Sequence, residues 1–211
     1  MRQPAEGRSE RKRRAILEAA EEVFLGGGYL GTNMDEIAAR SEVSKQTVYK
    51  HFGSKENLFV EIVSHMTTGA GDLVHEDVPD PAEDEDLADY LRDYALRQLT
   101  VVLTPRLMRL RRLVIGEVAR FPELAGALYE HGPRRAVGAL GEIFERLAVR
   151  GRLSVEDPHA AASRFNWLVM SEPVNRAMLL GDEGIPAREE LRAHAAESVR
   201  VFLAAYGGPR K

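Results

Sequence analysis

The chain has 211 residues, of which 44% are hydrophobic and 29% charged, and its formal net charge is −4. A chain of this length and composition can bury a sizeable core, which excludes a protein that is disordered throughout. Cysteine is absent and no run approaches the roughly 20 apolar residues that span a bilayer, so we expect a cytoplasmic protein with no disulfide framework, thiolate metal site, membrane span or export signal.

Apolar residues recur at helical spacing along the whole chain, which predicts an all-α fold. The first predicted helix covers about residues 10–25 and is stopped by three consecutive glycines. Thr32 is then expected to cap a short helix that ends near Arg40. After a brief turn, Ser44 is expected to cap a second short helix over residues 45–51.

A longer helix is predicted from Lys55 to about Val74, followed by an acidic loop or linker that contains proline, residues 76–86. Proline and glycine separate five or so further predicted helices. Their approximate ranges are 86–104, 106–119, 133–150, 158–180 and 186–206. A short turn is expected over residues 122–130, and Pro173 should kink its helix and free the backbone carbonyl near Val169.

Charge is distributed unevenly along the chain. Residues 1–14 carry six basic side chains against two acidic ones, whereas residues 72–93 carry ten acidic side chains against one arginine. This asymmetry predicts that an anion binds the first part of the chain and is kept off the second.

Two short helices joined by a tight turn and supported by a longer helix describe a helix-turn-helix unit, whose second helix reads DNA. The predicted second helix is polar over most of its surface, and no acidic residue occurs from Ser44 to Lys55. Lys55 lies in the first turn of the next helix, where the helix dipole disfavours a cation unless an anion such as phosphate is bound. A polar helix can also be a simple solvated face, but the combination favours DNA binding.

Two segments of the chain match a known pattern: GYLGTNMDEIA at 28–38 and VSKQTVYKHFGSKENL at 43–58. Together they resemble the DNA-binding head of the TetR, or tetracycline repressor, family, and the likeness covers about the first 65 residues. It implies a basic flexible arm at 1–9, a helix-turn-helix domain at 10–55 and a ligand-binding and dimerisation domain at 56–211.

The resemblance also implies which side chains meet DNA. Residues expected to approach phosphates are Thr32, Asn33, Tyr49, Lys50, His51 and Lys55; those expected to face bases are Lys45, Gln46 and Thr47; Ser44 belongs to the same surface. The turn departs from the family pattern, because Ser41-Glu42 stands where the family usually has Ala-Gly. If that backbone is left-handed, glutamate costs about 1 kcal/mol relative to glycine.

Aromatic and methionine side chains in the body can belong either to a core or to a pocket for an apolar ligand. The candidate ligand-binding residues are Tyr94, Met108, Phe121, Trp167 and Met170. The last two helices carry more apolar surface than one neighbour covers. Packing within the body could cover it, but the resemblance implies a two-fold dimer interface, with Phe165, Leu168, Val169, Met178, Leu191, Ala195, Val199 and Phe202 as its candidates.

Other signals are weak. The glycines at 26–31 fit G-x-G-x-x-G but lack the preceding strand that a dinucleotide site needs. The six histidines show no metal-ligand spacing, and nothing fixes two carboxylates around a substrate. We therefore expect no cofactor, no metal and no enzymatic activity.

The sequence thus predicts a homodimeric, ligand-responsive transcriptional regulator, a repressor that a small molecule releases from double-stranded palindromic operator DNA. Two alternatives stay open. One is a DNA-binding regulator of the same fold without an inducer, whose pocket is filled by its own side chains. The other is a helical enzyme or carrier whose head serves only as a scaffold.

Overall fold

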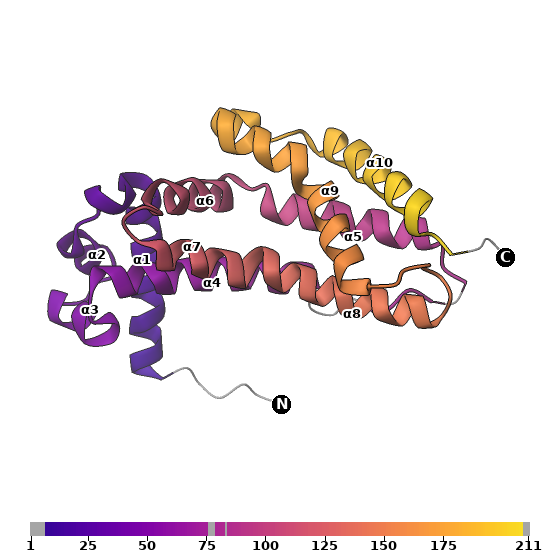
Figure 1. Ribbon diagram of the computed structural model, residues 1–211. Coiled ribbons are helices and arrows are strands. Elements are labelled where there is room, and N and C mark those ends of the chain that lie inside the picture. Colours follow the sequence, from indigo (N-terminus) through magenta and orange to yellow (C-terminus); the bar gives the residue numbers. More distant parts are fainter. Residues whose placement is uncertain (1–6, 76–78, 83, 209–211) are drawn as a thin grey trace. The chain divides into compact units, whose positions relative to one another are not determined.

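The structure, a computed structural model, describes residues 7–75, 79–82 and 84–208. Residues 1–6 of the predicted arm and residues 76–78 and 83 of the predicted acidic loop lie outside this range. The elements in Figure 1 are α1 (Arg8–Gly31), α2 (Met34–Arg40), α3 (Lys45–Phe52), α4 (Lys55–His75), α5 (Leu87–Val102), α6 (Pro105–Glu117), α7 (Pro122–Tyr129), a π-helical turn (Glu130–Arg134), α8 (Arg135–Val149), α9 (Pro158–Leu180), a 3₁₀ turn (Gly181–Gly184) and α10 (Arg188–Tyr206).

The predicted all-α fold is confirmed. Within the described residues the sole strand-like contact is an isolated bridge between Leu153 and Gly207. No helix in this part of the chain is both long enough and apolar enough to cross a membrane.

The chain forms two compact units. Unit 1 comprises Met1–Met66 and Arg112–Leu128, and unit 2 comprises Thr67–Arg111 and Tyr129–Lys211. The head predicted at residues 10–55 therefore lies within unit 1, which also takes in the first part of α4 and most of α7. Gly53 and Ser54 separate α3 from α4, and α4 itself is unbroken helix from Lys55 to His75.

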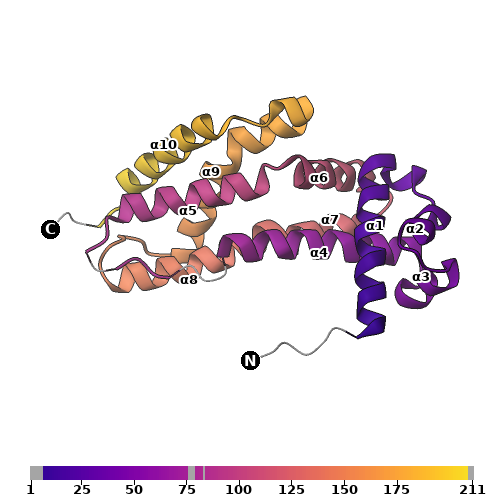
Figure 2. The ribbon, with the colours of Figure 1, turned by 180° about the vertical axis from the view of Figure 1, so that it is seen from behind.

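Unit 1 is built around α1, with α2 and α3 beside it (Figure 2). The predicted apolar stripe of α1 is buried, including Ile16, Ala20 and Phe24. The Phe24 ring stacks on Phe59 of α4 with their centroids 4.7 Å apart, and buried Val48 anchors α3. The short helices thus hold their positions through a small aromatic and aliphatic core.

The glycines interrupt the regular helix of α1, as predicted. At Gly28 the backbone leaves the helical conformation, with a φ of 71° that glycine tolerates, and a short helical segment follows it to Gly31. The Thr32 hydroxyl donates to the Gly28 carbonyl at 2.7 Å. Thr32 thus ends α1, and the cap of α2 is Asn33, whose side chain accepts from the Asp35 N–H at 2.9 Å. Both residue types cap helices well, so composition alone did not separate these neighbours.

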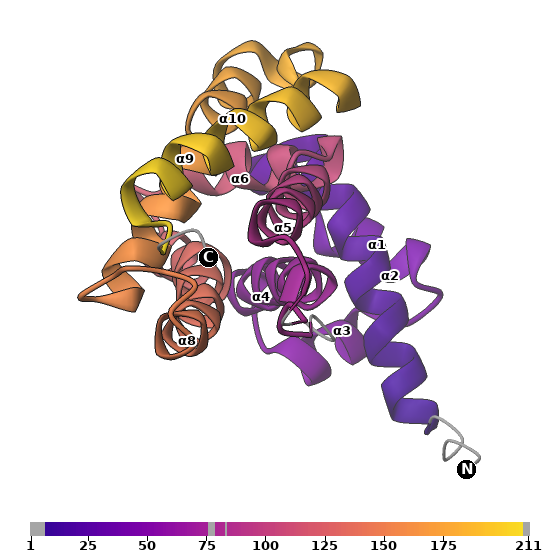
Figure 3. The same ribbon diagram turned by 90° about the vertical axis from the view of Figure 1, so that its right-hand side faces the viewer.

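Unit 2 packs α5, α8, α9 and α10 around one core. α9 crosses from α8 to α10 (Figure 1), and α10 packs against α5, which Figure 3 shows nearly end-on. Aromatic rings fill the centre: Phe165 lies edge-on to Phe144 and Phe202, with centroids 5.7 Å and 5.0 Å away. The start and end predicted for α9, residues 158 and 180, match the structure.

The segment predicted as a turn over residues 122–130 is helical instead. α7 continues into the π-helical turn and then into α8. Pro133 lies inside this turn, and because proline lacks an N–H, a wider hydrogen-bond pattern accommodates it where an α-helix would break. Beyond the turn, Arg135 donates to the Thr68 carbonyl at 3.1 Å and pairs with Asp72, which fixes α8 against α4 within unit 2.

Pro173 lies within α9, and the carbonyl that it leaves without an intrahelical donor is that of Val169. His194 of α10 lies 2.8 Å from this carbonyl through its ring Nε2. A carbonyl can only accept, so Nε2 carries the proton and donates. The freed carbonyl predicted from the sequence is thus satisfied by the neighbouring helix.

Candidate DNA-binding surface

The α2-turn-α3 segment presents one polar helix to solvent. Ser44 caps α3 as predicted, since its hydroxyl accepts from the Thr47 N–H at 3.2 Å. Val48 and Phe52 are buried and hold α3 against unit 1. Because side chains three and four residues apart share a helix face, the burial of these two leaves Lys45, Gln46, Tyr49 and Lys50 exposed and Thr47 and His51 half-buried.

The turn between the helices contains a left-handed residue. Glu42 has a φ of 54°, a backbone region in which L-residues with a Cβ are strained. Its N–H donates to the Ala39 carbonyl at 3.2 Å, and the following Val43 N–H donates to the Ala38 carbonyl at 3.0 Å. These bonds close the turn despite the strain. Glutamate in place of glycine therefore raises the conformational free energy of the turn, but the helix-turn-helix still forms.

Replacing Glu42 by glycine is expected to raise the free energy of unfolding by about 0.5–1 kcal/mol, because glycine adopts this φ without steric strain while losing more backbone entropy on folding. Urea unfolding followed by circular dichroism measures the change. Glu42→Gln removes the charge but keeps the Cβ, so it should not stabilise. An equal gain in Glu42→Gln would assign the effect to charge rather than to backbone strain.

The residues predicted to contact bases or phosphates differ in whether they have partners within the chain. Lys45 pairs with Asp35 of α2 at 3.0 Å, and this hydrogen bond raises the pKa of Lys45 above its ordinary value. Gln46 and Lys50 are exposed, and among the described residues neither has a hydrogen-bond or ion-pair partner. Asn33 is also exposed, at the start of α2. Gln46 and Lys50 are therefore available to an external partner without breaking any internal contact.

Lys55 and Thr32 are less exposed than the resemblance implied. The Thr32 side chain is buried. The Lys55 Nζ donates to the Thr32 carbonyl at 2.7 Å and lies 4.7 Å from the centre of the Tyr29 ring. Burial lowers the pKa of Lys55, and the carbonyl offers it a partner within the chain. The position of this cation in the first turn of α4 thus has a structural explanation beside the predicted phosphate contact.

Replacing Lys55 by methionine is expected to lower the free energy of unfolding by about 1–2 kcal/mol, because the bond from a charged donor to the Thr32 carbonyl is lost. If Lys55 also meets a phosphate, affinity falls alike for all DNA sequences and the salt dependence loses about one counterion. Urea unfolding and filter binding over a salt series measure the two effects. An unchanged salt slope, or a shifted sequence preference, would contradict the phosphate contact.

The basic start of α1 is partly engaged inside unit 1. The helix begins at Arg8, two residues earlier than predicted. Arg13 pairs with Glu61 of α4, and its guanidinium lies 5.4 Å from the centre of the Phe52 ring. Arg11 is exposed. This segment therefore both braces α3 and offers positive charge at the surface.

The five candidate ligand residues do not form one group. Tyr94, Met108 and Met170 belong to the same buried core of unit 2. Phe121 lies in unit 1, where its ring is 4.5 Å from that of Tyr29. Trp167 is 46% exposed on α9. The structure thus brings three of the five together and separates the other two.

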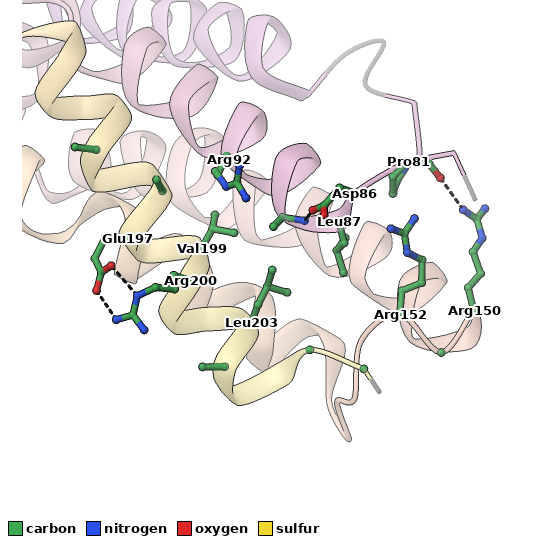
Figure 4. A pocket seen from close by; sticks show the side chains of 17 residues that line it. Pro81, Asp86, Leu87, Arg92, Arg150, Arg152, Glu197, Val199, Arg200 and Leu203 are labelled. Carbon is green, nitrogen blue, oxygen red and sulfur yellow. Dashed lines mark hydrogen bonds and ion pairs between the residues drawn. The ribbon is translucent and has the colours of Figure 1, made fainter. Parts of the chain in front are cut away.

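A cavity of about 1530 Å³ lies in unit 2 beside the start of α5, the loop after α8 and one side of α10 (Figure 4). It is lined by none of the five candidates. Two of its arginines hold the loop before α5: Arg150 pairs with Asp80 at 3.0 Å, and Arg152 donates to the Ala82 carbonyl at 2.9 Å. The charged groups of this cavity therefore have structural partners.

The predicted dimer residues are mostly core residues of a single chain, which corrects the interpretation of their apolar stripe. Buried within unit 2 are Phe165, Val169, Leu191, Ala195, Val199 and Phe202. Leu168 and Met178 are half-buried. The large apolar side chains that α9 and α10 do expose are Trp167, Leu179, Leu180 and Val201. Helical periodicity identified a buried stripe but could not tell which neighbour covers it.

A capped helix-turn-helix with an outward polar second helix defines a DNA-binding protein. The chain matches bacterial regulatory proteins of the tetR family over residues 16–62 and the C-terminal domain of AefR-like transcriptional repressors over residues 89–208. The HTH-type transcriptional repressor Rv3405c of Mycobacterium tuberculosis (strain H37Rv) is 30% identical over 174 residues, which cover 80% of each chain.

Solved structures agree with these matches. A TetR-family regulator from Mesorhizobium loti MAFF303099 is 39% identical, with a TM-score of 0.90 over 96% of this chain and 100% of its own. The flavonoid-responsive regulator FrrA is 31% identical, with a TM-score of 0.76 over 95% of this chain and 99% of its own. The chain belongs to the TetR family, whose members are transcriptional regulators rather than enzymes.

Proposed function

We propose that the protein is a homodimeric repressor that binds a palindromic operator through α3 and is released by a small molecule bound in unit 2. The observation that carries the DNA-binding part is the exposed polar face of α3, with Gln46 and Lys50 free of partners among the described residues. Repression is supported by Rv3405c, a named repressor that matches this chain in the body as well as in the head.

The dimer is proposed to form through the exposed apolar residues of α9 and α10. Trp167 and Val201 are 46% and 42% exposed, and half-buried Leu168 adjoins Trp167 on α9. Exposed aromatic residues of this kind are enriched at the centres of protein interfaces. A two-fold axis would place two copies of α3 on half-sites about 34–36 Å apart along the DNA.

A small-molecule effector is proposed because FrrA is described as responsive to flavonoids and matches nearly the whole chain. We propose an uncharged aromatic molecule bearing hydroxyl groups as the class of effector. Its binding would change the separation of the two heads and so their fit to the half-sites.

Selection of bound DNA from a random pool tests the proposal. The expected result is a palindrome with two half-sites one helical turn apart, lost in a Gln46→Ala/Lys50→Ala double variant that remains folded. A single non-repeated site would contradict the dimer, and unselective binding would contradict operator recognition.

A regulator of the same fold without an inducer is the second candidate. The burial of Tyr94, Met108 and Met170 in the core favours it, because side chains already fill that space. A measurement of operator affinity with and without a hydroxylated aromatic molecule distinguishes the two candidates. The inducible repressor loses operator affinity when the molecule is added, and the regulator without an inducer does not.

A further inference from the structure

A row of polar side chains runs along the buried face of α5. Tyr90, Tyr94 and Gln98 are spaced by four residues and therefore share one helix face. All three are buried in unit 2. The Tyr94 hydroxyl lies 2.7 Å from the His75 Nδ1. Helical periodicity alone would place apolar residues on such a face, so the polar groups call for a separate explanation.

Gln98 is paired on one side only. Its Nε2 donates to the Oδ1 of Asn166 on α9 at 2.7 Å, and the two side chains are 3% and 2% exposed. The Gln98 Oε1 is buried and has no hydrogen-bond partner among the described residues. A buried acceptor without a donor opposes folding, so such groups are rare and point to a missing partner.

The surroundings define the chemistry of that partner. One turn away from Gln98 on α5 is Tyr94, and one turn away from Asn166 on α9 is Met170, both part of the apolar core of unit 2. Methionine repacks readily because its side chain is unbranched and flexible. The buried side chains of α5 and α9 that carry polar atoms here, Tyr90, Tyr94, Gln98 and Asn166, are all uncharged. Burying an ionised ligand beside these neutral groups costs more than burying a neutral molecule that donates one hydrogen bond.

We infer that Gln98 and Asn166 form the polar anchor of the effector site, where the Gln98 Oε1 accepts a hydrogen bond from a hydroxyl of an uncharged aromatic ligand. This inference rests on the proposed small-molecule response and adds the residues that recognise the ligand. The Gln98-Asn166 bond also ties α5 to α9, and that role accounts for the Nε2 group. It does not account for the unpaired Oε1, which a ligand hydroxyl satisfies.

The first test observes Gln98 without altering the core. The chain contains three glutamines, Gln3, Gln46 and Gln98, so ¹⁵N-glutamine labelling with Gln3→Ser and Gln46→Ala variants assigns each side-chain amide signal in NMR spectra. Naringenin, a neutral flavonoid with free hydroxyls, serves as the probe. The expected result is a saturable shift of the Gln98 amide signal. No binding of naringenin to the full chain, or binding that leaves this signal unmoved, would overturn the inference.

The second test measures affinity by calorimetry. Gln98→Leu is expected to weaken naringenin binding at least tenfold, and circular dichroism checks that the variant keeps the helical content of the parent. Tyr90→Phe is the matched control, because it removes the other buried polar atom on α5 that lacks a partner among the described residues; its affinity should stay within twofold of the parent. Naringenin with all hydroxyls methylated should bind both the parent and Gln98→Leu weakly.

Equal naringenin affinity in the parent and in Gln98→Leu would place the ligand elsewhere and overturn the anchor, even if naringenin still releases the operator. Failure of the palindrome selection described above would instead contradict the proposed function while the NMR shift still reports the site. The two failures are therefore distinguishable.

Discussion

Replacing Phe202 by glutamate is expected to unfold unit 2 rather than only to separate a dimer. Phe202 is 2% exposed, and its ring lies 5.2 Å from Phe144, 5.0 Å from Phe165 and 5.0 Å from Tyr206 between centroids. Truncating a buried phenylalanine costs about 3–5 kcal/mol, and an unpaired buried carboxylate adds to that loss. Because a domain is stable by only about 5–15 kcal/mol, the variant should lose most or all of its stability.

Urea unfolding followed by circular dichroism checks this result, with Val201→Glu as the matched control. Val201 precedes Phe202 on α10 but is 42% exposed in the single chain, so the same new charge is solvated in the dissociated protein and should change the stability of the monomer by less than about 1 kcal/mol. Sedimentation should show Val201→Glu as a folded monomer if the proposed interface is correct. If the Phe202→Glu variant has the stability of the parent and its dimer dissociates, the apolar stripe of α10 that contains Phe202 would be the dimer interface after all.

Periodicity and capping rules predicted most of the helices because these signals are local. Ser44 caps α3 and the ends of α9 match the prediction, since a capping hydroxyl or a proline acts within one turn. The carbonyl freed by Pro173 was likewise predictable from one residue. The failure over residues 122–130 has a different cause: a π-helical turn continues the helix through Pro133, a residue type that usually ends one.

The candidate sites were predictable to different degrees. The outward face of α3 followed from the burial of Val48, which one apolar residue in a polar helix already indicates. The partner of an apolar stripe did not follow, because Phe202 looks the same whether its own chain or a second copy covers it. Gln98 and Asn166 were missed because they are 68 residues apart in sequence and neither amide is unusual until the fold brings the two together.

Replacing Gln46 by alanine is expected to relax recognition of a single base pair in each half-site. Gln46 is the second residue of α3, is exposed and has no partner within the described residues, so its amide can pair in bidentate fashion with adenine in the major groove. Losing such a pair costs about 1–3 kcal/mol of discrimination, which is about 5–150-fold in affinity at that position. Affinities for an operator panel with one base pair changed at a time measure the effect.

Lys50→Ala is the control, because the point charge of lysine does not distinguish one base pair from another. This variant should bind all sequences more weakly to the same extent, and the slope of log affinity against log salt should fall by about one. A uniform loss across the panel for Gln46→Ala would assign Gln46 to the phosphate contacts and leave base reading to its neighbours on α3.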